Sequence, residues 1–154
     1  MATTITDATL TVTLTETITL NGSSQGSKNT FTVSSVDEIF KRIVSCAASQ
    51  TTTLIVFNDN AYGVDSAVDV QDSKYIRITN KDDTNSVELA VIGSATLYQV
   101  KLDAGQSHIL GSADDLVLAE ADTSPSFGTM TDLSSIKCNP GVNAVEVELF
   151  VASI

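Results

Sequence analysis

The sequence has no tryptophan, only two cysteines and two prolines, and no apolar run approaching the roughly 20 residues of a membrane-spanning helix. Cys46 and Cys138 are too few, and too distant in the sequence, for a disulfide framework or a zinc site, which both use closely spaced pairs. We expect two reduced, unbridged thiols. The first residues lack the basic and apolar regions of a secretory signal, so we expect folding in a cytoplasm and no membrane partner.

Basic residues are also scarce. Eight Lys and Arg stand against 19 Asp and Glu, which gives a net charge of −11 and an isoelectric point near 4.1. A phosphate backbone would be repelled by such a chain, so we expect no nucleic-acid partner. The length of 154 residues and the hydrophobic content of 42% fit one globular domain.

What the sequence does contain is threonine, at 20 positions, arranged with a strand period. Residues 9–20 read TLTVTLTETITL, with aliphatic residues at most even positions and threonine at the odd ones. This alternation predicts a strand with one apolar and one hydroxyl face, and its length predicts a break or bulge near Glu16. A polar loop is expected over 21–29, and a second strand over 30–33. Asn21-Gly22-Ser23 fits the glycosylation pattern but is better interpreted as a turn.

Residues 35–46 allow two interpretations. Apolar residues at helical spacing and the capping-box pair Ser35 and Glu38 favour a helix. Alternation of Phe40, Val44 and Cys46 with polar residues favours a strand equally well. We predict a short turn over 36–39 followed by a strand over 40–47.

The rest of the chain predicts short strands separated by turns. Residues 74–80 and 86–92, joined by five residues of turn composition, are expected to form a hairpin. About nine or ten strands with at most one short helix predict an all-β, antiparallel sandwich or jelly roll, a single domain over 1–154 whose residues 1–8 form a flexible arm. The further strands are expected at 51–57, 96–102, 107–110, 116–119, 133–138 and 142–152.

The sequence offers little evidence for catalytic residues. His108, the only histidine, follows Ser107 and has Asp103, Asp114 and Asp115 nearby in the sequence. A nucleophile would need a strained turn and an oxyanion hole, and no such motif accompanies the serine. We interpret His108 as structural and expect no enzyme activity.

Metal, sugar and phosphate sites are equally unsupported, and we expect no catalytic, cofactor or metal residues and no cofactor. Residues 58–63 begin like a calcium loop, but Tyr62 and Asp69 replace the oxygen donor and the glutamate that the motif needs. Residues 22–28 lack the spacing of a phosphate loop. The carboxylates of Glu146 and Glu148 share one strand face, which we interpret as the solvated face. The remaining features considered are the carboxylate pairs Asp82-Asp83 and Asp114-Asp115 and the tyrosines Tyr62, Tyr75 and Tyr98.

Three stretches carry a family resemblance. They are TLTETITLNGSSQGSKNTFTVSSVDEIFKRIVS over 13–45, YIRITNKDDTNSVELAVIGSATLYQVKLDAGQSHIL over 75–110, and LSSIKCNPGVNAVEVELFVAS over 133–153. Together they resemble small β-rich virion proteins of tailed bacteriophages, especially phages of cyanobacteria.

The resemblance implies a virion structural protein, foremost a capsid decoration or cement protein on the outside of the shell. A neck or tail component, or a carbohydrate-binding or enzymatic jelly roll, is the alternative. It also implies a homo-oligomer, with a trimer favoured, that binds the major capsid protein or another virion protein and is assembled in the host cytoplasm.

Overall fold

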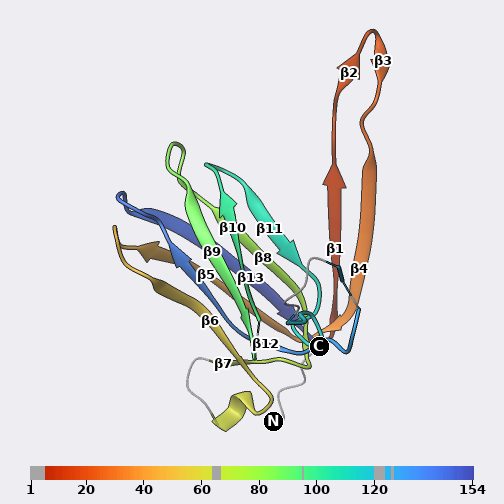
Figure 1. Ribbon diagram of the computed structural model, residues 1–154. Coiled ribbons are helices and arrows are strands. Elements are labelled where there is room, and N and C mark those ends of the chain that lie inside the picture. Colours follow the sequence, from red (N-terminus) through yellow and green to blue (C-terminus); the bar gives the residue numbers. More distant parts are fainter. Residues whose placement is uncertain (1–5, 64–66, 95, 120–123, 126) are drawn as a thin grey trace.

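Two sheets, of five and four strands, form the body of the molecule in the computed structural model, which describes residues 6–63, 67–94, 96–119, 124–125 and 127–154 (Figure 1). All neighbouring strands run antiparallel except β6 and β7. The predicted all-β sandwich is therefore confirmed. The five-stranded sheet has the order β10 (Leu97–Leu102), β9 (Val87–Gly93), β12 (Leu133–Asn139), β6 (Thr52–Asn58), β7 (Ala67–Asp69). The four-stranded sheet has the order β11 (Ser107–Leu110), β8 (Ser73–Asn80), β13 (Val145–Ser153), β5 (Glu38–Cys46).

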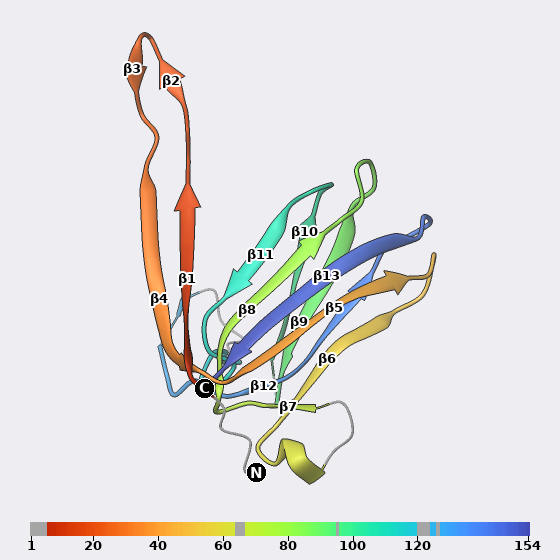
Figure 2. The ribbon, with the colours of Figure 1, turned by 180° about the vertical axis from the view of Figure 1, so that it is seen from behind.

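Residues 8–36 form a long hairpin, which we call the arm, that projects away from the sandwich (Figures 1 and 2). The break predicted near Glu16 is confirmed, because β1 ends at Thr15. The polar loop predicted over 21–29 is wrong in extent, since short strands and the start of β4 occupy part of it. The expected arm over 1–8 is not the projecting element: residues 1–5 lie outside the described part, and Ala8 already belongs to β1. The strands of the arm are β1 (Ala8–Thr15), β2 (Thr19–Leu20), β3 (Ser23–Ser24) and β4 (Lys28–Val36).

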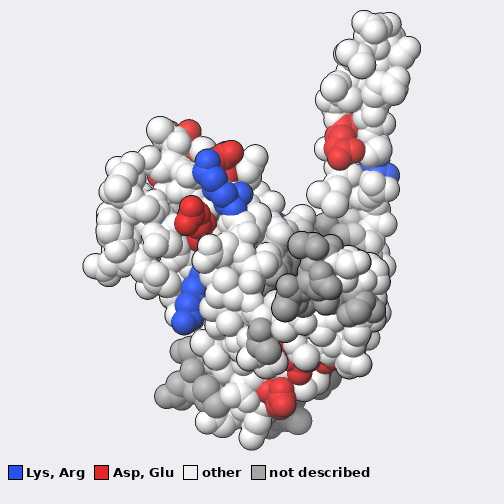
Figure 3. All heavy atoms as spheres, viewed as in Figure 1, with Lys and Arg blue, Asp and Glu red and all other residues white. Residues whose placement is uncertain are grey.

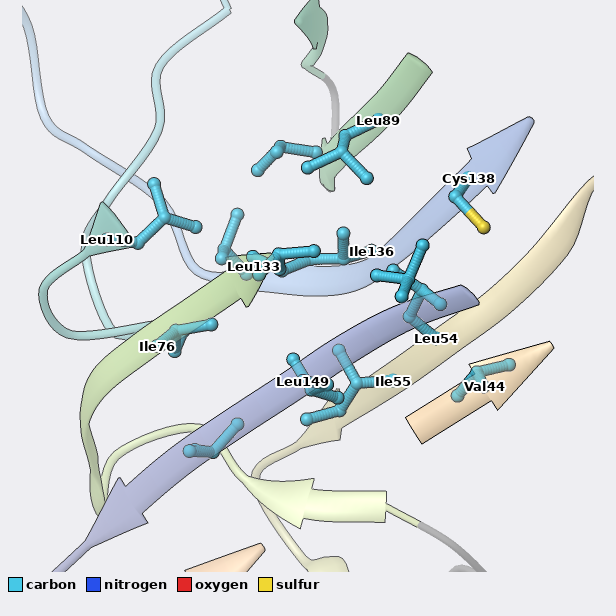
Figure 4. Packing of buried hydrophobic residues seen from close by; sticks show 14 of the residues in the cluster. Val44, Leu54, Ile55, Ile76, Leu89, Leu110, Leu133, Ile136, Cys138 and Leu149 are labelled. Atoms are coloured by element: carbon cyan, nitrogen blue, oxygen red, sulfur yellow. The ribbon is translucent and has the colours of Figure 1, made fainter. Parts of the chain in front are cut away.

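The core lies between the two sheets and follows the period of two that the sequence shows. Along β13, Val145, Val147, Leu149 and Val151 are buried and face the opposite sheet. Aliphatic side chains from β5, β6, β8, β9 and β12 meet them (Figure 4). This apolar interior is the main source of stability, since burying one such side chain contributes about 1.5–3 kcal/mol.

The ambiguous segment 35–46 contains no helix. Ser35 and Val36 end β4, and Glu38–Cys46 form β5, which pairs with β13 over its whole length. The predicted strand over 40–47 is therefore confirmed, whereas the predicted turn over 36–39 is wrong, because only Asp37 lies between the two strands. The helix-like spacing arose because Ile39 and Ile43 are apolar on the outer face of this strand while Phe40 and Val44 point inward. Among the described residues, helical structure is limited to the short 3₁₀ helix η1 (Ala61–Gly63).

Two further expectations are wrong. Strands β8 and β9 belong to different sheets, so the loop over 81–85 crosses the sandwich and does not close a hairpin. The segment 116–119 is not a strand: Val117 forms one isolated bridge to Thr131. Turn residues mark where a chain reverses but not whether the next strand joins the same sheet. Within the described ranges, no helix is long and apolar enough to cross a membrane.

Candidate functional site: the arm and the cleft beside it

The arm has two chemically different faces. In the β1–β4 register, Leu10 lies opposite Val33 and Val12 opposite Phe31, while Thr11 and Thr13 lie opposite Thr32 and Thr30. Because successive residues of a strand point to opposite faces, one face is aliphatic and aromatic and the other is covered with hydroxyl groups.

The tip of the arm is a two-residue turn that confirms the interpretation of Asn21-Gly22 as a turn. Leu20 pairs with Ser23, and both residues between them have positive φ, 50° at Asn21 and 80° at Gly22. Asn-Gly favours this mirror-image turn because both residues tolerate the left-handed region. The arm is therefore a continuous hairpin whose turn is specified by the sequence.

The base of the apolar face packs on the outer surface of the four-stranded sheet. Leu10, Val12 and Val33 contact a small cluster built around Tyr75 and Ala152, with Phe150 beside it. The rings of Phe31 and Tyr75 lie 5.8 Å apart, and those of Tyr75 and Phe150 5.9 Å apart, distances typical of favourable aromatic pairs. This contact fixes the direction in which the arm leaves the sandwich.

Beyond its base the arm diverges from the sheet (Figure 1). An open cleft of about 460 Å³ lies between the arm and the sheet (Figure 3). One wall is formed by β1 and the other by the outer face of β8, β11 and β13. The lining residues are Leu10, Thr11, Val12, Thr13, Leu14, Tyr75, Arg77, Ser107, Ile109 and Phe150.

The distal part of the apolar face has no cover in the described structure. Leu14 is 48% exposed, Ile18 53% and Leu20 59%, and Phe31 is 40% exposed despite its contact with Tyr75. Soluble proteins expose single apolar residues routinely, but an apolar series on one face of a projecting element marks an interaction surface. These are candidate interaction residues that the sequence interpretation missed, although alternation followed by Asn-Gly was the signal for them.

The arm is also nearly free of charge. Among residues 8–36 the charged side chains are Glu16 and Lys28, which cancel, so the rest of the chain carries the whole net charge of −11. Figure 3 shows mostly uncharged atoms along the arm on the face in view. Two copies of the chain would repel each other through their acidic bodies but not through their neutral arms. The arm is therefore the part of the chain that is best suited to contact another acidic molecule.

One residue that lines the cleft, Arg77, belongs to an ion network. Arg77 Nη2 lies 2.6 Å from Glu148 Oε1, and Lys41 Nζ lies 3.6 Å from Glu148 Oε2. The hydrogen bond from Arg77 holds the pKa of Glu148 below its usual range. The expectation that Glu148 lies on a solvated face is therefore wrong for this residue, whose side chain is only 13% exposed, whereas Glu146 is exposed.

The serine and histidine considered as a catalytic pair are not in contact. Ser107 Oγ lies 2.7 Å from Thr79 Oγ1, while His108 Nε2 lies 3.1 Å from the hydroxyl of Tyr98. Adjacent residues of a strand point to opposite faces, which explains the separation. Half-burial of the imidazole lowers the pKa of His108. The aspartate considered with them, Asp103, instead forms an exposed ion pair with Lys101.

The other carboxylates serve mainly in loops. Asp82 accepts backbone hydrogen bonds from Thr84 and Asn85, which lower its pKa. Asp114 and Asp115 meet Asp132, and each offers an oxygen within 4.8 Å of the others. Asp132 accepts the N–H of Asp115 at 2.8 Å.

The segment 58–63 also forms ordinary turns. The Asn58 side chain accepts the N–H of Asn60, and Asp69 lies opposite Asn58 in the β6–β7 pair, where its carboxylate accepts the N–H of Gln71. The side chain of Tyr62 lies outside the described part. The other tyrosines are packed, Tyr75 within the cluster at the base of the arm and Tyr98 against His108.

The comparisons with known proteins are sparse. No family model matches the chain, and no curated protein matches it. A solved structure from Bacillus endospore appendages, described as "a novel family of disulfide-linked pili", aligns with 13% identity and a TM-score of 0.38, covering 75% of this chain and 88% of that one. This neighbour is a β-rich structural protein, but the likeness is too distant to support an argument about function.

Proposed function

We propose that the protein is a structural subunit, without enzyme activity, that binds copies of itself through the arm. The observation that carries the proposal is the uncovered apolar face at Leu14, Ile18 and Leu20. In the same molecule the cleft presents a matching apolar wall, which the base of the arm already uses for packing. The distal arm of one copy is proposed to lie against the cleft of the next.

A second copy suits the arm better than an unrelated partner for two reasons. Contact through the neutral arm keeps the acidic bodies of two subunits apart, which reduces their electrostatic repulsion. In addition, β1 and β4 form a two-stranded sheet in the described structure. The outer edge of each strand therefore offers unpaired backbone N–H and C=O groups. Edge strands of this kind readily add a strand from another molecule.

The proposed place of the subunit is a phage particle, foremost the outer surface of its capsid. Support comes from the sequence resemblance described above, together with an acidic surface that has no need to meet packaged DNA. The major capsid protein is then the second proposed partner, a trimer the proposed assembly, and a neck or tail position the alternative.

Self-association is tested by placing the same charge on the two faces of the arm. Leu14→Glu lies on the apolar face and Thr32→Glu on the hydroxyl face, away from the cleft, and both positions are exposed. In sedimentation velocity over a concentration series, Leu14→Glu is expected to weaken association at least tenfold and Thr32→Glu to change it little. A wild-type chain that stays monomeric throughout, or equal effects of the two variants, would refute the proposal.

The place in a particle is tested separately. Peptides of this chain are expected in mass spectra of purified phage, and immunogold labelling is expected over the head. Labelling confined to the neck or tail would favour the alternative position, and absence from particles would reject the virion assignment while leaving the self-association result intact.

A further inference from the structure

The two cysteines, far apart in the sequence, meet inside the sandwich. Cys46 ends β5 in the four-stranded sheet, and Cys138 lies in β12 of the five-stranded sheet. Their sulfur atoms are 2.9 Å apart, although 92 positions separate the residues. Both are free thiols and both are buried, so each sulfur has the other as its neighbour across the interface between the sheets.

The surroundings of the pair do not resemble a metal site. In the described part of the chain, three or more side chains that could bind one metal ion come together only at Asp114, Asp115 and Asp132, a group that does not include either cysteine. Two thiolates without a third or fourth protein ligand do not make the closed tetrahedral site of structural zinc. Apart from the contact with Cys138, Cys46 has a long hydrogen bond to the carbonyl of Val44, at 3.8 Å.

We propose that Cys46 and Cys138 form an intramolecular disulfide that joins the two sheets when the chain folds in the presence of a small-molecule disulfide. The sulfur atoms need to approach by roughly 0.9 Å to reach the bond length of about 2.05 Å. Such a movement is small for side chains at strand positions that already face each other. In a reducing cytoplasm the chain would keep two free thiols, as expected from the sequence. After oxidation it would contain the disulfide.

The chemistry balances as a two-electron exchange. A thiolate of the chain attacks oxidised glutathione, which forms a mixed disulfide and releases one reduced glutathione. The second cysteine then displaces the other glutathione and closes the Cys46–Cys138 bond. Two thiol protons and two electrons pass from the protein to two glutathione molecules.

Within the folded pair, the contact between the two sulfurs shifts the pKa values of the thiols in opposite directions. The hydrogen bond from Cys138 lowers the pKa of Cys46, while the same contact and burial raise the pKa of Cys138. Because both sulfurs are buried, glutathione reaches them while the chain is folding or transiently open, and the reaction therefore depends on refolding conditions.

The experiment refolds the reduced, full-length chain from denaturant into anaerobic glutathione buffers of increasing oxidised fraction. Intact mass and maleimide labelling under denaturing conditions count the free thiols. We expect loss of two hydrogens and of both labels, at an oxidised fraction at least tenfold lower than the fraction at which Cys46→Ala or Cys138→Ala acquires bound glutathione. The single variants are matched controls because each retains one thiol and cannot close the bridge.

Stability supplies the second readout on the wild-type chain alone. Closing a long loop constrains the unfolded state, so the oxidised form is expected to unfold roughly 10 °C above the reduced form. Two free thiols at every glutathione ratio, mixed disulfides as the end product, disulfide-linked dimers, or an oxidised form that is no more stable would each overturn the proposal. A failure here leaves the proposed role of the arm unaffected.

Discussion

Asn80 is a fully buried polar residue whose side chain ties the loops at one end of the sandwich together. Its Nδ2 group donates to the carbonyl of Asn85 at 2.8 Å and lies 3.3 Å from the carbonyls of Leu102 and Asp103. Its Oδ1 atom accepts the N–H of Asp82 at 3.0 Å. One side chain therefore satisfies backbone groups in two regions of the chain, 82–85 and 102–103.

Replacement of this residue is expected to destabilise the whole sandwich. Asn80→Ala leaves several backbone groups unsatisfied, and we expect the free energy of unfolding to fall by about 3 kcal/mol in guanidinium titrations. Asn143→Ala is the matched control. The side-chain amide of Asn143 donates an exposed hydrogen bond to Asn85, and the loss of this bond is expected to cost about 0.5 kcal/mol or less. A change below 1 kcal/mol at Asn80 would contradict this account.

His108 is expected to make stability depend on pH. Burial lowers its pKa in the folded chain, so the unfolded chain binds a proton first as the pH falls below about 6.5. The free energy of unfolding should therefore decrease from pH 7 toward pH 5, by at most about 1.4 kcal/mol per pH unit. In His108→Gln this part of the slope should flatten. An unchanged slope in the variant would assign the effect to other groups.

Glu148 acts in the same direction at lower pH, which separates the two contributions. Its pKa is lowered by Arg77 in the folded chain, so its stabilisation is present above the unfolded value and is lost as the pH falls through the folded one. That loss begins near pH 4.5, where the unfolded carboxylate starts to bind a proton. Measurements between pH 7 and pH 5 therefore report mainly on His108.

At the scale of elements, the arm depends on one glycine at its break. A Cβ atom at Gly26 would lie 2.0 Å from the carbonyl oxygen of Glu16, a contact that forces the backbone to move. Next to it, the N–H of Glu16 donates to Ser27 at 2.8 Å and the N–H of Gln25 donates to Ile18 at 3.0 Å. These bonds hold the distal hairpin together across the gap between β1 and β2.

Gly26→Ala is therefore expected to loosen the distal arm and leave the sandwich intact. Amide hydrogen exchange over residues 16–27 should accelerate at least tenfold, while the midpoint of thermal unfolding changes by less than about 3 °C. Gly22→Asn serves as the control, because asparagine tolerates positive φ and nothing lies within 4 Å of the added atom. Unchanged exchange in Gly26→Ala, or unfolding of the sandwich, would contradict this division.

The elements also show how far the sequence leads. Alternation around Thr11 and the Asn21-Gly22 pair are local signals, and they predicted β1, the break after it and the turn at the tip. The polar composition of residues 21–29 concealed β3 and the start of β4. The sequence of β5 also fitted a helix because Ile39 and Ile43 are apolar. Both side chains are exposed on the outer face of the strand and do not belong to the core. The meeting of Cys46 with Cys138, and the crossing of the loop over 81–85, depend on which sheet each strand joins, a long-range property that no local pattern encodes.

For the whole molecule, the contrast between a neutral arm and an acidic body predicts the effect of salt. Two bodies of charge −11 repel each other at low ionic strength, and ions screen this repulsion, while the apolar contact of the arm is not weakened by added salt. Association measured by light scattering should therefore strengthen as NaCl rises from about 20 to 300 mM. Weaker association in salt would indicate that charged contacts hold the copies together.

The position of β13 in the sheet has a consequence for synthesis on the ribosome. This strand pairs with β5 on one side and β8 on the other, so the four-stranded sheet has no centre until residues 145–153 have been translated. Until then β5 and β8 have no strand between them, and the side chains of Ile76, Ile78 and Val44 lack the neighbouring apolar residues of β13, so the nascent chain exposes apolar surface to chaperones and to neighbouring chains. The arm precedes β5 and pairs within itself, so it can form before the sandwich is complete.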